Sequence, residues 1–586
     1  MVRVRAPEFI AGTWFNTAGP LTLRGLRGRF VLLDFWTFCC GNCLHVIDEV
    51  RPLEAKYRDV LTVVGVHSPK FEHERGDAAV RAAVERYEVD HPVLNDPDLQ
   101  LWRQYAVKAW PTLVLVDPDG YVVAQAAGEG QVSALDEMIA ALAPGYELRR
   151  GDGPYTPPTP QPSVLRFPAK AVALPGGTLL VADAGHHQLV ELDGDDVVRR
   201  IGSGQRGRVD ATAGTARFAE PNGLALVPPG IAGFDVVVAD TANHVLRGVR
   251  SEDGAVVATL DLPAALRGVS TVTGEIPPVL SPWDLAWWPA RQTLVVAAAG
   301  VHLLLAVDPA TGAAEVLAGT TVEGLRDGPA IDGWLAQPSG LAVDGDQVWF
   351  ADSETSALRY LTAAGELHTV IGAGLFEFGH VDGPAHQARL QHPLGVTVLP
   401  DGAVAVLDTY NGAVRRYDPA SDTVTTLARD LIEPSGAVLL DGDLVVVESG
   451  AHRLVRPVPR SELVTGTPQH AARPESPIAS GPVTLDVRFE PAPGRKLDDR
   501  FGPSTRLSVT ASPPELLVSG AGESGELARE LVLAASGTGV LQVIAQAASC
   551  DEGGEHPACY LARQDWGVPV RITPDGAARL ELVLLG

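Results

Sequence analysis

The sequence has few cysteines and no excess of positive charge. Its 586 residues include only five cysteines, too few for the dense disulfide framework of a small secreted domain. The formal net charge is −26, and a protein that binds nucleic acid needs a basic face, so nucleic acid is not an expected partner. The same balance of charge disfavours binding to an anionic membrane surface.

Long apolar runs are also missing. No segment approaches the roughly 20 apolar residues of a membrane-spanning helix, and the first residues, MVRVRAPEFIAGTWF, contain no apolar run of signal-peptide length. We therefore expect a cytoplasmic protein without a membrane partner. Glycine (61 residues) and proline (46 residues) are abundant instead, which favours a turn-rich β protein.

The order of sequence patterns predicts three domains joined by two linkers. Residues 1–150 alternate buried-strand and amphipathic-helix patterns, which is typical of an α/β sandwich. Residues 163–465 are repetitive, and residues 481–586 contain short alternating strands that predict a β-sandwich. Because proline stiffens a chain and cannot donate to a sheet, we interpret the proline-rich stretches 151–162 and 466–480 as linkers.

The repetitive region consists of six similar units. Each unit begins with a proline and a short apolar strand, and a second apolar strand follows that usually ends in an acidic residue. Six units of about 40 to 60 residues, each with several short strands, predict a six-bladed β-propeller. The unit prolines are Pro168, Pro221, Pro282, Pro338, Pro393 and Pro434.

Acidic residues and histidines recur at fixed places in these units, in a pattern that resembles the NHL repeat. Because a closed ring spaces equivalent residues around its axis, we interpret them as repeated turn contacts, not as ligands of one metal ion. We see no cluster of inward acids or histidines that would make the propeller catalytic. The acidic strand ends are Asp183, Asp240, Asp352, Asp408 and Glu448, and the histidines are His187, His244, His302 and His452.

Three of the five cysteines lie within LLDFWTFCCGNCLHVIDEV. Cys40 and Cys43 are separated by two residues at a predicted strand-to-helix junction. The N–H groups at the start of a helix favour a thiolate at Cys40, and Cys43, one turn later, can resolve a mixed disulfide. A zinc site is not expected, because only His45 is close enough in sequence to add a fourth ligand. We expect His45 itself to be a solvated helix residue.

This segment resembles the thioredoxin signature D-F-W-x-x-W-C-G-P-C, and residues 15–145 are similar to TlpA-like thioredoxins. The resemblance implies that Cys40 is the nucleophile, that Cys43 resolves the adduct, and that Asp34 moves a proton to or from the resolving sulfur. It also places Trp110-Pro111 at the cis-proline element beside the disulfide, so Pro111 is expected to shape the active site, with Trp110 as a modulator.

Two residues depart from that signature. Cys39 stands where the family has tryptophan, and Asn42 stands where it has proline. Because the residues around the cysteines tune the redox potential, both are candidate modulators. Cys39 also permits a Cys39–Cys40 or a Cys39–Cys43 bridge, although a bridge between adjacent cysteines is strained. Farther along, Cys550 and Cys559 can form a hairpin disulfide, but a cytoplasmic setting favours free thiols there.

The order of domains resembles the NHL-repeat-containing protein 2 family, which carries a similar Cys-Cys-x-x-Cys centre. The resemblance implies a multidomain α/β plus all-β chain: a thioredoxin-like domain, a six-bladed NHL propeller and a C-terminal β-sandwich. We expect a thiol–disulfide oxidoreductase without cofactor or metal, whose propeller binds a protein partner or substrate. The alternatives are a non-enzymatic interaction scaffold, in which the thioredoxin-like domain is inert, and a redox sensor.

Overall fold

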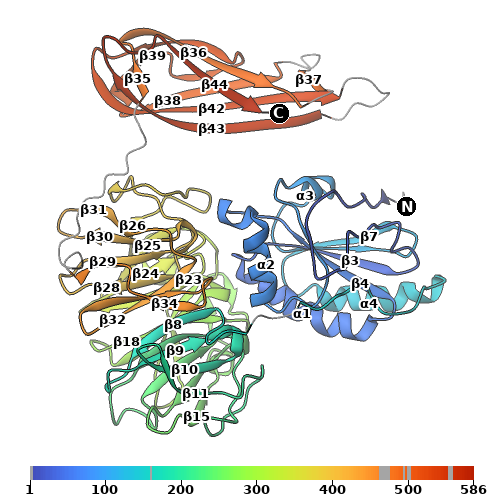
Figure 1. Ribbon diagram of the computed structural model, residues 1–586, viewed down its shortest axis with the longest axis vertical. Helices are drawn as coiled ribbons and strands as arrows, with labels where there is room; N and C mark the ends of the chain where they lie inside the picture. The colour runs from blue at the N-terminus through green and yellow to red at the C-terminus, as the bar shows by residue number, and fades with distance from the viewer. Residues whose placement is uncertain are drawn as a thin grey trace. The chain divides into compact units, whose positions relative to one another are not determined.

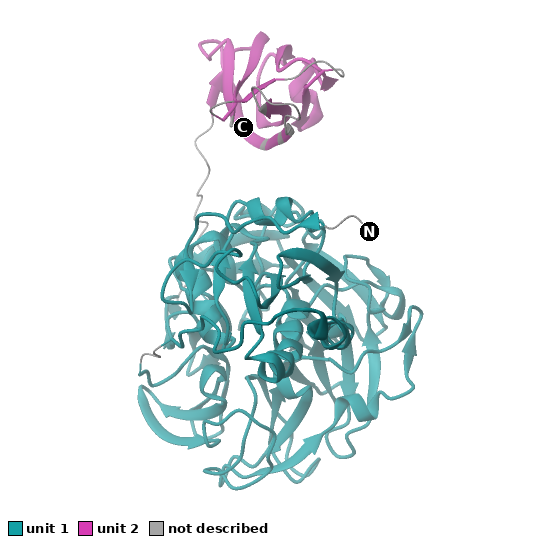
Figure 2. Ribbon diagram, turned by 90° about the vertical axis from the view of Figure 1, so that its right-hand side faces the viewer, with its two compact units in different colours: residues 1–469 teal, residues 470–586 magenta. Residues whose placement is uncertain are grey.

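The chain divides into two compact units, residues 1–469 and residues 470–586 (Figure 2). The first unit contains the thioredoxin-like domain and the propeller, and the second contains a C-terminal sandwich (Figure 1). Among the described residues, no helix combines the length and the apolar character that crossing a membrane requires. The computed structural model describes residues 4–158, 162–460, 463, 476–492, 495–497, 503–551 and 559–585.

A seven-stranded sheet with strand order β1-β7-β6-β3-β4-β5-β2 forms the centre of the N-terminal domain. Its strands are β1 (Val4–Arg5), β2 (Trp14–Phe15), β3 (Phe30–Trp36), β4 (Leu61–His67), β5 (Val93–Asn95), β6 (Thr112–Val116) and β7 (Tyr121–Ala127). The helices are α1 (Gly41–Tyr57), α2 (Asp77–Arg86), α3 (Gln100–Gln104) and α4 (Val132–Leu142), with short 3₁₀ turns η1 (Glu72–Arg75) and η2 (Ala143–Gly145).

Both faces of this sheet are covered, so β3 is buried at all seven positions. Side chains alternate between the faces of a strand. Phe30 and Leu32 therefore pack with residues of α1 and α4, whereas Val31 and Leu33 pack with Leu101 of α3. β6 and β7 pair antiparallel on either side of the Asp117–Gly120 turn. β3 is thus a central, buried strand, and the cysteine motif follows directly after its last residue.

The predicted linkers lie partly outside the described residues, which omit 159–161 and 466–475. The first half of the 151–162 stretch follows the N-terminal domain closely. Gly151 donates its N–H to the carbonyl of Asp59 at 3.1 Å, and Thr156 donates to the carbonyl of Asn16 at 2.8 Å. This part of the stretch therefore belongs to the surface of the thioredoxin-like domain.

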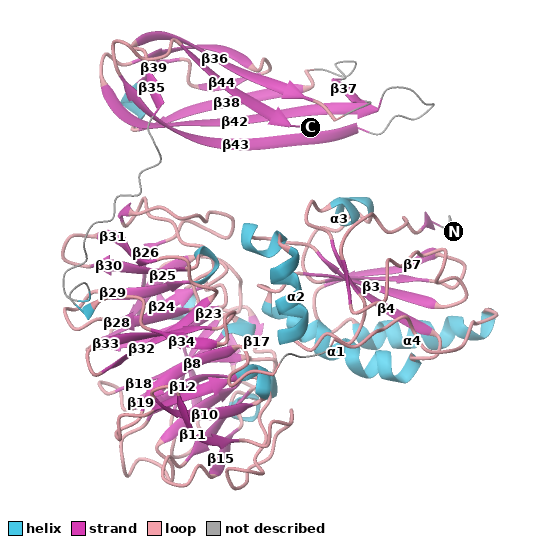
Figure 3. Cartoon of the chain, viewed as in Figure 1, coloured by secondary structure: helices cyan, strands magenta, loops and turns pink. Residues whose placement is uncertain are grey.

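Six antiparallel sheets form the propeller, and the longer helices all lie outside it (Figure 3). One strand of each blade lies beside one strand of the next blade around the ring, in the order β8, β12, β18, β23, β28, β32 and back to β8. This contact between β32 and β8 closes the ring and hides the inner strand edges, as closure does in propellers generally.

The blade strands have the following bounds. Blade 1 contains β8 (Pro168–Ala173), β9 (Leu179–Asp183), β10 (Gln188–Asp193) and β11 (Asp196–Ile201); blade 2 contains β12 (Pro221–Leu226), β13 (Val236–Asp240), β14 (Val245–Val249) and β15 (Val256–Leu260). Blade 3 contains β18 (Pro282–Trp288), β19 (Thr293–Ala298), β20 (Leu303–Val307) and β21 (Ala314–Ala318), preceded by α5 (Leu262–Ala265) and the hairpin β16 (Ser270–Thr271) and β17 (Gly274–Glu275). Blade 4 contains β22 (Gly328–Pro329), β23 (Pro338–Asp344), β24 (Gln347–Asp352), β25 (Ala357–Thr362) and β26 (Glu366–Ile371). Blade 5 contains β27 (Gly383–Pro384), β28 (Gly395–Val398), β29 (Val404–Asp408), β30 (Ala413–Asp418) and β31 (Thr423–Ala428), and blade 6 contains β32 (Pro434–Leu440), β33 (Asp443–Glu448) and β34 (Arg453–Val455).

The repeated acids and histidines hold the blades together. Asp240 Oδ1 accepts the N–H of Ala219, two residues before the unit proline, at 2.7 Å. His244 Nδ1 accepts the N–H of Ser281 in the next blade at 3.2 Å, and His452 Nδ1 accepts that of Phe167 at 2.9 Å, which ties the sixth blade to the first. These side chains therefore act as structural ties. Within the described part of the chain, no group of three His, Cys, Asp or Glu side chains is arranged to hold a metal ion.

The second unit is a sandwich of two sheets, β35-β43-β42-β38-β40, with β37 beside β42, and β39-β41-β36-β44. Alternate residues of β36, Val483, Leu485 and Val487, point into its core. The strands are β35 (Ser476–Ile478), β36 (Gly481–Glu490), β37 (Arg495–Leu497), β38 (Thr505–Ser512), β39 (Leu517–Ser519), β40 (Gly522–Ser524), β41 (Ala528–Leu533), β42 (Gly537–Asp551), β43 (Cys559–Ile572) and β44 (Arg579–Leu585).

The expectation of free thiols in this unit is wrong for Cys550, which is disulfide-bonded. Cys550 on β42 lies directly opposite Cys559 in the antiparallel ladder with β43. Opposed residues of such a ladder have Cα atoms roughly 4.5–5.5 Å apart, within the range that a disulfide spans. The sequence places both cysteines on either side of a loop, but only the strand register sets them face to face.

Candidate active site

The loop between β3 and α1 is held by one buried carboxylate. Glu74 Oε1 accepts hydrogen bonds from Thr37 Oγ1 at 2.7 Å and from the N–H of Cys39 at 2.9 Å. Its other oxygen accepts the N–H of Phe71 at 2.9 Å. The N–H of Lys70 donates to the same oxygen at 2.9 Å, so four donors share the two oxygens of Glu74 and fix the loop. The cysteines that follow are therefore presented by a rigid segment.

Cys40 and Cys43 differ in exposure and in their surroundings. Cys40 is the half-buried N-cap of α1, and its Sγ accepts the N–H of Cys43 at 3.3 Å. A sulfur at the N-terminus of a helix is favoured as a thiolate by the helix dipole. Cys43 is completely buried, and burial together with its hydrogen bond to Cys40 raises the pKa of its thiol well above the usual value. Cys40 is thus the accessible thiol and Cys43 the protected one.

The Cys39 side chain lies in a different environment. It is 1% exposed, and burial raises the pKa of its thiol well above the usual value, with further increases from the carboxylates of Glu354 and Glu74. All three thiols of the motif are free, so neither bridge that Cys39 permits is present. A buried, protonated thiol is a poor nucleophile, which separates Cys39 from the reactive pair.

Asp34 lies beneath the motif in the middle of β3. It is fully buried, and neither of its carboxyl oxygens has a hydrogen-bond partner among the described residues. Burial raises the pKa of this carboxyl from 3.8 to about 7, although His91 lowers it slightly. Its charge also raises the pKa of Cys43, so the two groups are neighbours. A carboxyl that titrates near neutral pH is suited to proton exchange with a thiol.

Trp110 and Pro111 lie on the loop that precedes β6, and the peptide bond between them is cis. Trp110 packs in the same cluster as Cys40 and Cys43, and its Nε1 donates to the carbonyl of Ser68 at 2.8 Å. Asn42, in the first turn of α1, has a buried side-chain oxygen without a partner among the described residues. The structure therefore brings Asp34, Cys40, Cys43 and Trp110 together around one site.

The propeller covers the start of α1, an arrangement that the sequence did not predict. Gln337 Oε1 accepts the N–H of Gly41 at 3.0 Å, directly beside Cys40. On the other side of the motif, the rings of Phe38 and Tyr410 of the propeller pack edge to face at 5.9 Å. In Figure 1, α1 and α2 lie on the side of the N-terminal domain nearest the propeller. The cysteine motif therefore faces an interdomain interface.

One residue of each blade, the residue before each unit proline, contributes to this interface. All six have a positive φ, between 40° and 59°. Gln337 and Ser281 form hydrogen bonds, with Gly41 and His45. Two others make ring contacts: Phe167 with the Arg86 guanidinium (4.7 Å from the ring centroid) and His392 with Phe71 (5.3 Å between centroids). Glu433 pairs with Arg86 and His73, and Glu220 is linked to Asp48 through Arg206. The repeat keeps its proline but varies the residue before it, and this variation is the signal in the sequence that marks the surface.

His45 is part of this interface, so the expectation of a solvated helix residue is wrong. It is 8% exposed, and its Nε2 lies 2.6 Å from Ser281 Oγ in the propeller. Its Nδ1 lies 2.5 Å from Glu129 Oε1. The helix face that carries His45 would meet water in an isolated domain, but here the third blade covers it.

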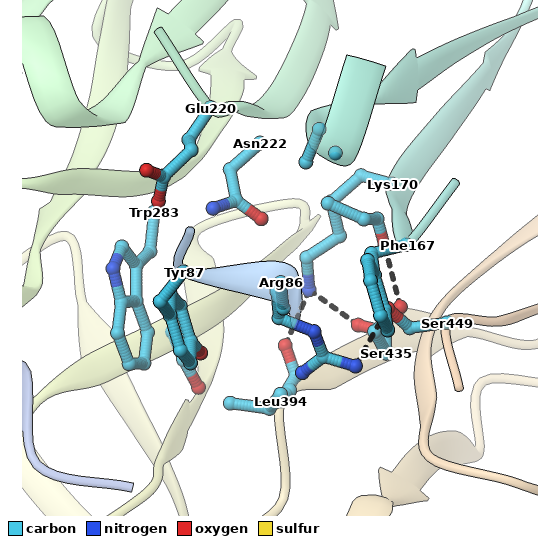
Figure 4. A pocket seen from close by; sticks show the side chains of 14 residues that line it. Arg86, Tyr87, Phe167, Lys170, Glu220, Asn222, Trp283, Leu394, Ser435 and Ser449 are labelled. Atoms are coloured by element: carbon cyan, nitrogen blue, oxygen red, sulfur yellow. Dashed lines mark hydrogen bonds between the residues drawn. The ribbon is translucent and has the colours of Figure 1, made fainter. Parts of the chain in front are cut away.

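Two adjoining cavities lie between the motif and the propeller axis. The first, of about 70 Å³, reaches Gly41 and Leu44 at the start of α1. The second, of about 80 Å³, lies over the centre of the propeller and is lined by Arg86, Phe167 and Lys170, among others (Figure 4). Both cavities are lined by Tyr87, Glu220, Asn222 and Trp283, so they share one wall.

An ion pair between two blades, Lys170 with Asp284, lies beside the second cavity, which Lys170 lines. The third residue of four units is glycine, but it is Lys170 in the first and Asp284 in the third. Lys170 Nζ lies 3.7 Å from Asp284 Oδ2 and donates to the carbonyl of Ser435 at 2.7 Å. A Cβ on Gly436 would lie 2.8 Å from Lys170 Cδ, so glycine makes room for the pair. Lys170 and Asp284, the two exceptions to the glycine of the repeat, are visible in the sequence.

Replacing Asp34 by asparagine should stabilise the protein at alkaline pH. An acid whose folded-state pKa is raised destabilises the fold as pH rises from the unfolded value, 3.8, through about 7. The full effect above pH 7 is a loss of about 4 kcal/mol from the free energy of unfolding. Urea unfolding followed by tryptophan fluorescence should therefore favour Asp34→Asn at pH 8 and show little difference near pH 4. Asp98→Asn, at an exposed site, is the control; a pH-independent difference would contradict the burial of an ionisable Asp34.

Comparison with known proteins places these features in a family. Residues 28–122 match a family model described as thioredoxin-like. The chain is 28% identical over 124 residues to the thiol-disulfide oxidoreductase ResA of Bacillus thuringiensis. This match covers 21% of this chain and 69% of that protein. The first domain therefore has thiol–disulfide oxidoreductases among its relatives.

Longer matches extend through the propeller. The chain is 33% identical over 499 residues to the Arabidopsis thaliana protein SUPPRESSOR OF QUENCHING 1, chloroplastic; the match covers 77% of this chain but 46% of that protein, so the chain spans about half of its length. It is 32% identical over 613 residues to NHL repeat-containing protein 2 of Bos taurus, with 89% of this chain and 83% of that protein covered. Together with the thioredoxin-like domain and the six-bladed propeller, this match shows that the chain belongs to the NHL repeat-containing protein 2 family.

Proposed function

We propose that the protein is a thiol–disulfide oxidoreductase that acts on low-molecular-weight disulfides. The observation that carries this proposal is the contrast between the two cysteines: Cys40 is an accessible helix N-cap, and Cys43 is buried beside a carboxyl with a pKa of about 7. That contrast suits one thiol for attack and the other for resolution.

The chemistry needs two steps. The Cys40 thiolate attacks one sulfur of the substrate disulfide, the substrate S–S bond breaks, and the other sulfur leaves as a thiolate that takes up a proton. Cys43 then transfers its proton to the Asp34 carboxylate, and its sulfur attacks Cys40 Sγ. This attack forms a Cys40–Cys43 disulfide and releases the second substrate sulfur as a thiolate, which takes up a proton from water. The substrate gains two electrons and the protein loses two, so an external thiol must reduce the protein again.

The position of the propeller argues for a small substrate. Gln337 and Tyr410 lie against both sides of the motif, which leaves little room for the surface of a folded protein. The adjoining cavities offer the aromatic rings of Tyr87 and Trp283 and the polar groups of Arg86 and Glu220. These groups suit the ammonium and carboxylate ends of a small disulfide built from amino acids, part of which the cavities of about 70 and 80 Å³ can hold. The propeller then serves to hold the thioredoxin-like domain and to form the substrate site with it.

Equilibration with glutathione redox buffers tests the proposal. Between about −100 and −300 mV, peptide mapping should show a reversible Cys40–Cys43 disulfide in the wild type and in Cys39→Ala. The reduced protein should also reduce glutathione disulfide faster than insulin. Thiols that persist at Cys40 and Cys43 throughout the range, or a bridge that always includes Cys39, would overturn it.

A further inference from the structure

Behind Cys43, four unpaired polar atoms gather around Gly65. They are both carboxyl oxygens of Asp34, Trp36 Nε1 and His91 Nε2, and none has a hydrogen-bond partner among the described residues. A Cβ on Gly65 would lie 3.0 Å from Trp36 Nε1 and 3.3 Å from His91 Nε2. Asp34 is the partner of Gly65 in the ladder of β3 with β4. These side chains therefore form one buried polar cluster at Gly65, whose missing side chain lets them approach one another.

Buried polar atoms without partners are costly and rare, and they commonly mark a site where water or a proton is handled. Four of them in one cluster, contributed by three side chains, are therefore unlike ordinary core packing. Asp34 and His91 are the two titratable members. Their charges interact, since His91 lowers the pKa of the Asp34 carboxyl.

His91 also connects this polar cluster with the surface. Its side chain is 3% exposed, and its second ring nitrogen, Nδ1, lies 3.4 Å from Glu54 Oε2. Glu54 lies on α1 and is 24% exposed, and it lines a surface cleft together with Arg51, Arg58 and Asp90. One imidazole thus faces a buried carboxyl on one side and a solvent-accessible carboxylate on the other.

We propose that His91 and Glu54 conduct the proton that Asp34 takes from Cys43 to the solvent. The route is needed because the propeller covers the motif on its other side, at Gly41 and Phe38. This inference rests on the proposed function, since it supplies the exit for the proton released in the resolving step.

The proton balance is simple. Cys43 loses its proton to Asp34 as its sulfur attacks Cys40, and Asp34 passes that proton to His91 Nε2 through intervening solvent. His91 releases the proton on Nδ1 to the Glu54 carboxylate, which exchanges it with bulk water. The charged groups that interact with His91 include Asp34 from β3 and Glu54 from α1, and Gly65 of β4 lies beside its Nε2. No electron moves along this route, and return of the imidazole to its first tautomer completes the cycle.

Stopped-flow measurement of the resolving step tests this route. The mixed disulfide at Cys40 is formed with glutathione disulfide, and its resolution by Cys43 is timed from pH 6 to pH 9. His91→Gln should slow resolution by about tenfold or more at pH 7, a modest loss for removal of an acid–base group. Glu54→Gln should slow it less, because water can replace a surface acceptor. Attack by Cys40 should be unchanged in both variants, and the solvent deuterium isotope effect on resolution should rise.

His67→Gln is the matched control. His67 is an equally buried histidine of the same domain; its Nδ1 faces Asn95 and its ring packs against Trp36, so it borders the cluster without joining Asp34 to Glu54. Unchanged resolution in both His91→Gln and Glu54→Gln would overturn the route, as would an equal loss in His67→Gln. A wild type that forms no adduct at Cys40 would instead contradict the proposed function. NMR titration of Asp34 decides the route in that case: His91→Gln should raise the Asp34 pKa, and an unchanged value would overturn it.

Discussion

Cys40→Ser should reduce the rate of glutathione disulfide reduction to about one thousandth of the wild-type rate or less, because a hydroxyl cannot replace the attacking thiolate. Cys40 is the only accessible thiol of the motif among the described residues: Cys39 and Cys43 are at most 1% exposed. The loss should therefore not be compensated by a neighbouring sulfur. Initial rates with a coupled assay for the released thiol provide the measurement.

Cys39→Ser is the matched control for this prediction. Cys39 is adjacent in sequence, but burial keeps its thiol protonated, so its replacement should retain most of the activity. Equal and large losses in Cys39→Ser and Cys40→Ser would mean that the motif works as a three-cysteine unit. Full activity of Cys40→Ser would exclude the assigned nucleophile.

Lys70→Met should destabilise the docked arrangement of the first unit by about 3–5 kcal/mol, the usual effect of removing one partner of a buried ion pair. Lys70 precedes η1 of the thioredoxin-like domain and pairs with Glu354 of the propeller; their side chains are 9% and 3% exposed. Burial alone would raise the pKa of Glu354, but Lys70 and His392 lower it to about 2, so its carboxylate stays charged. Without Lys70, that charge loses its strongest partner at the interface.

Thermal unfolding and limited proteolysis provide the measurements for Lys70→Met. The variant should unfold at a lower temperature and become sensitive to protease at the interface. Lys108→Met, at an exposed site of the same domain, should behave as the wild type. Equal stability of both variants would show that this ion pair does not hold the two domains together.

The sequence predicts the fold well where a pattern depends on local chemistry. Six prolines and the strands that follow them are enough for a six-bladed ring, because each blade repeats the same turn. The placement of Cys40 and Cys43 between a buried strand and an amphipathic helix likewise predicts the start of α1. The comparisons support both interpretations.

The remaining features depend on contacts between distant segments. His45 carries the pattern of a solvated helix residue, and only docking of the third blade buries it against Ser281. Lys170 and Asp284 are far apart in sequence and meet because the ring closes. Cys550 and Cys559 are set opposite each other by the register of two strands. Such relations between faces are not encoded in the local periodicity from which elements are predicted.

Mapping the adduct on Cys43→Ser tests the central claim most directly. This variant lacks the resolving thiol, so incubation with glutathione disulfide should arrest the reaction at the first step. The account predicts one stable glutathione adduct, located on Cys40 by peptide mass spectrometry. An adduct on Cys39 instead, or no adduct on the motif while denatured protein reacts readily, would contradict the assignment of Cys40 as the nucleophile of a thiol–disulfide oxidoreductase.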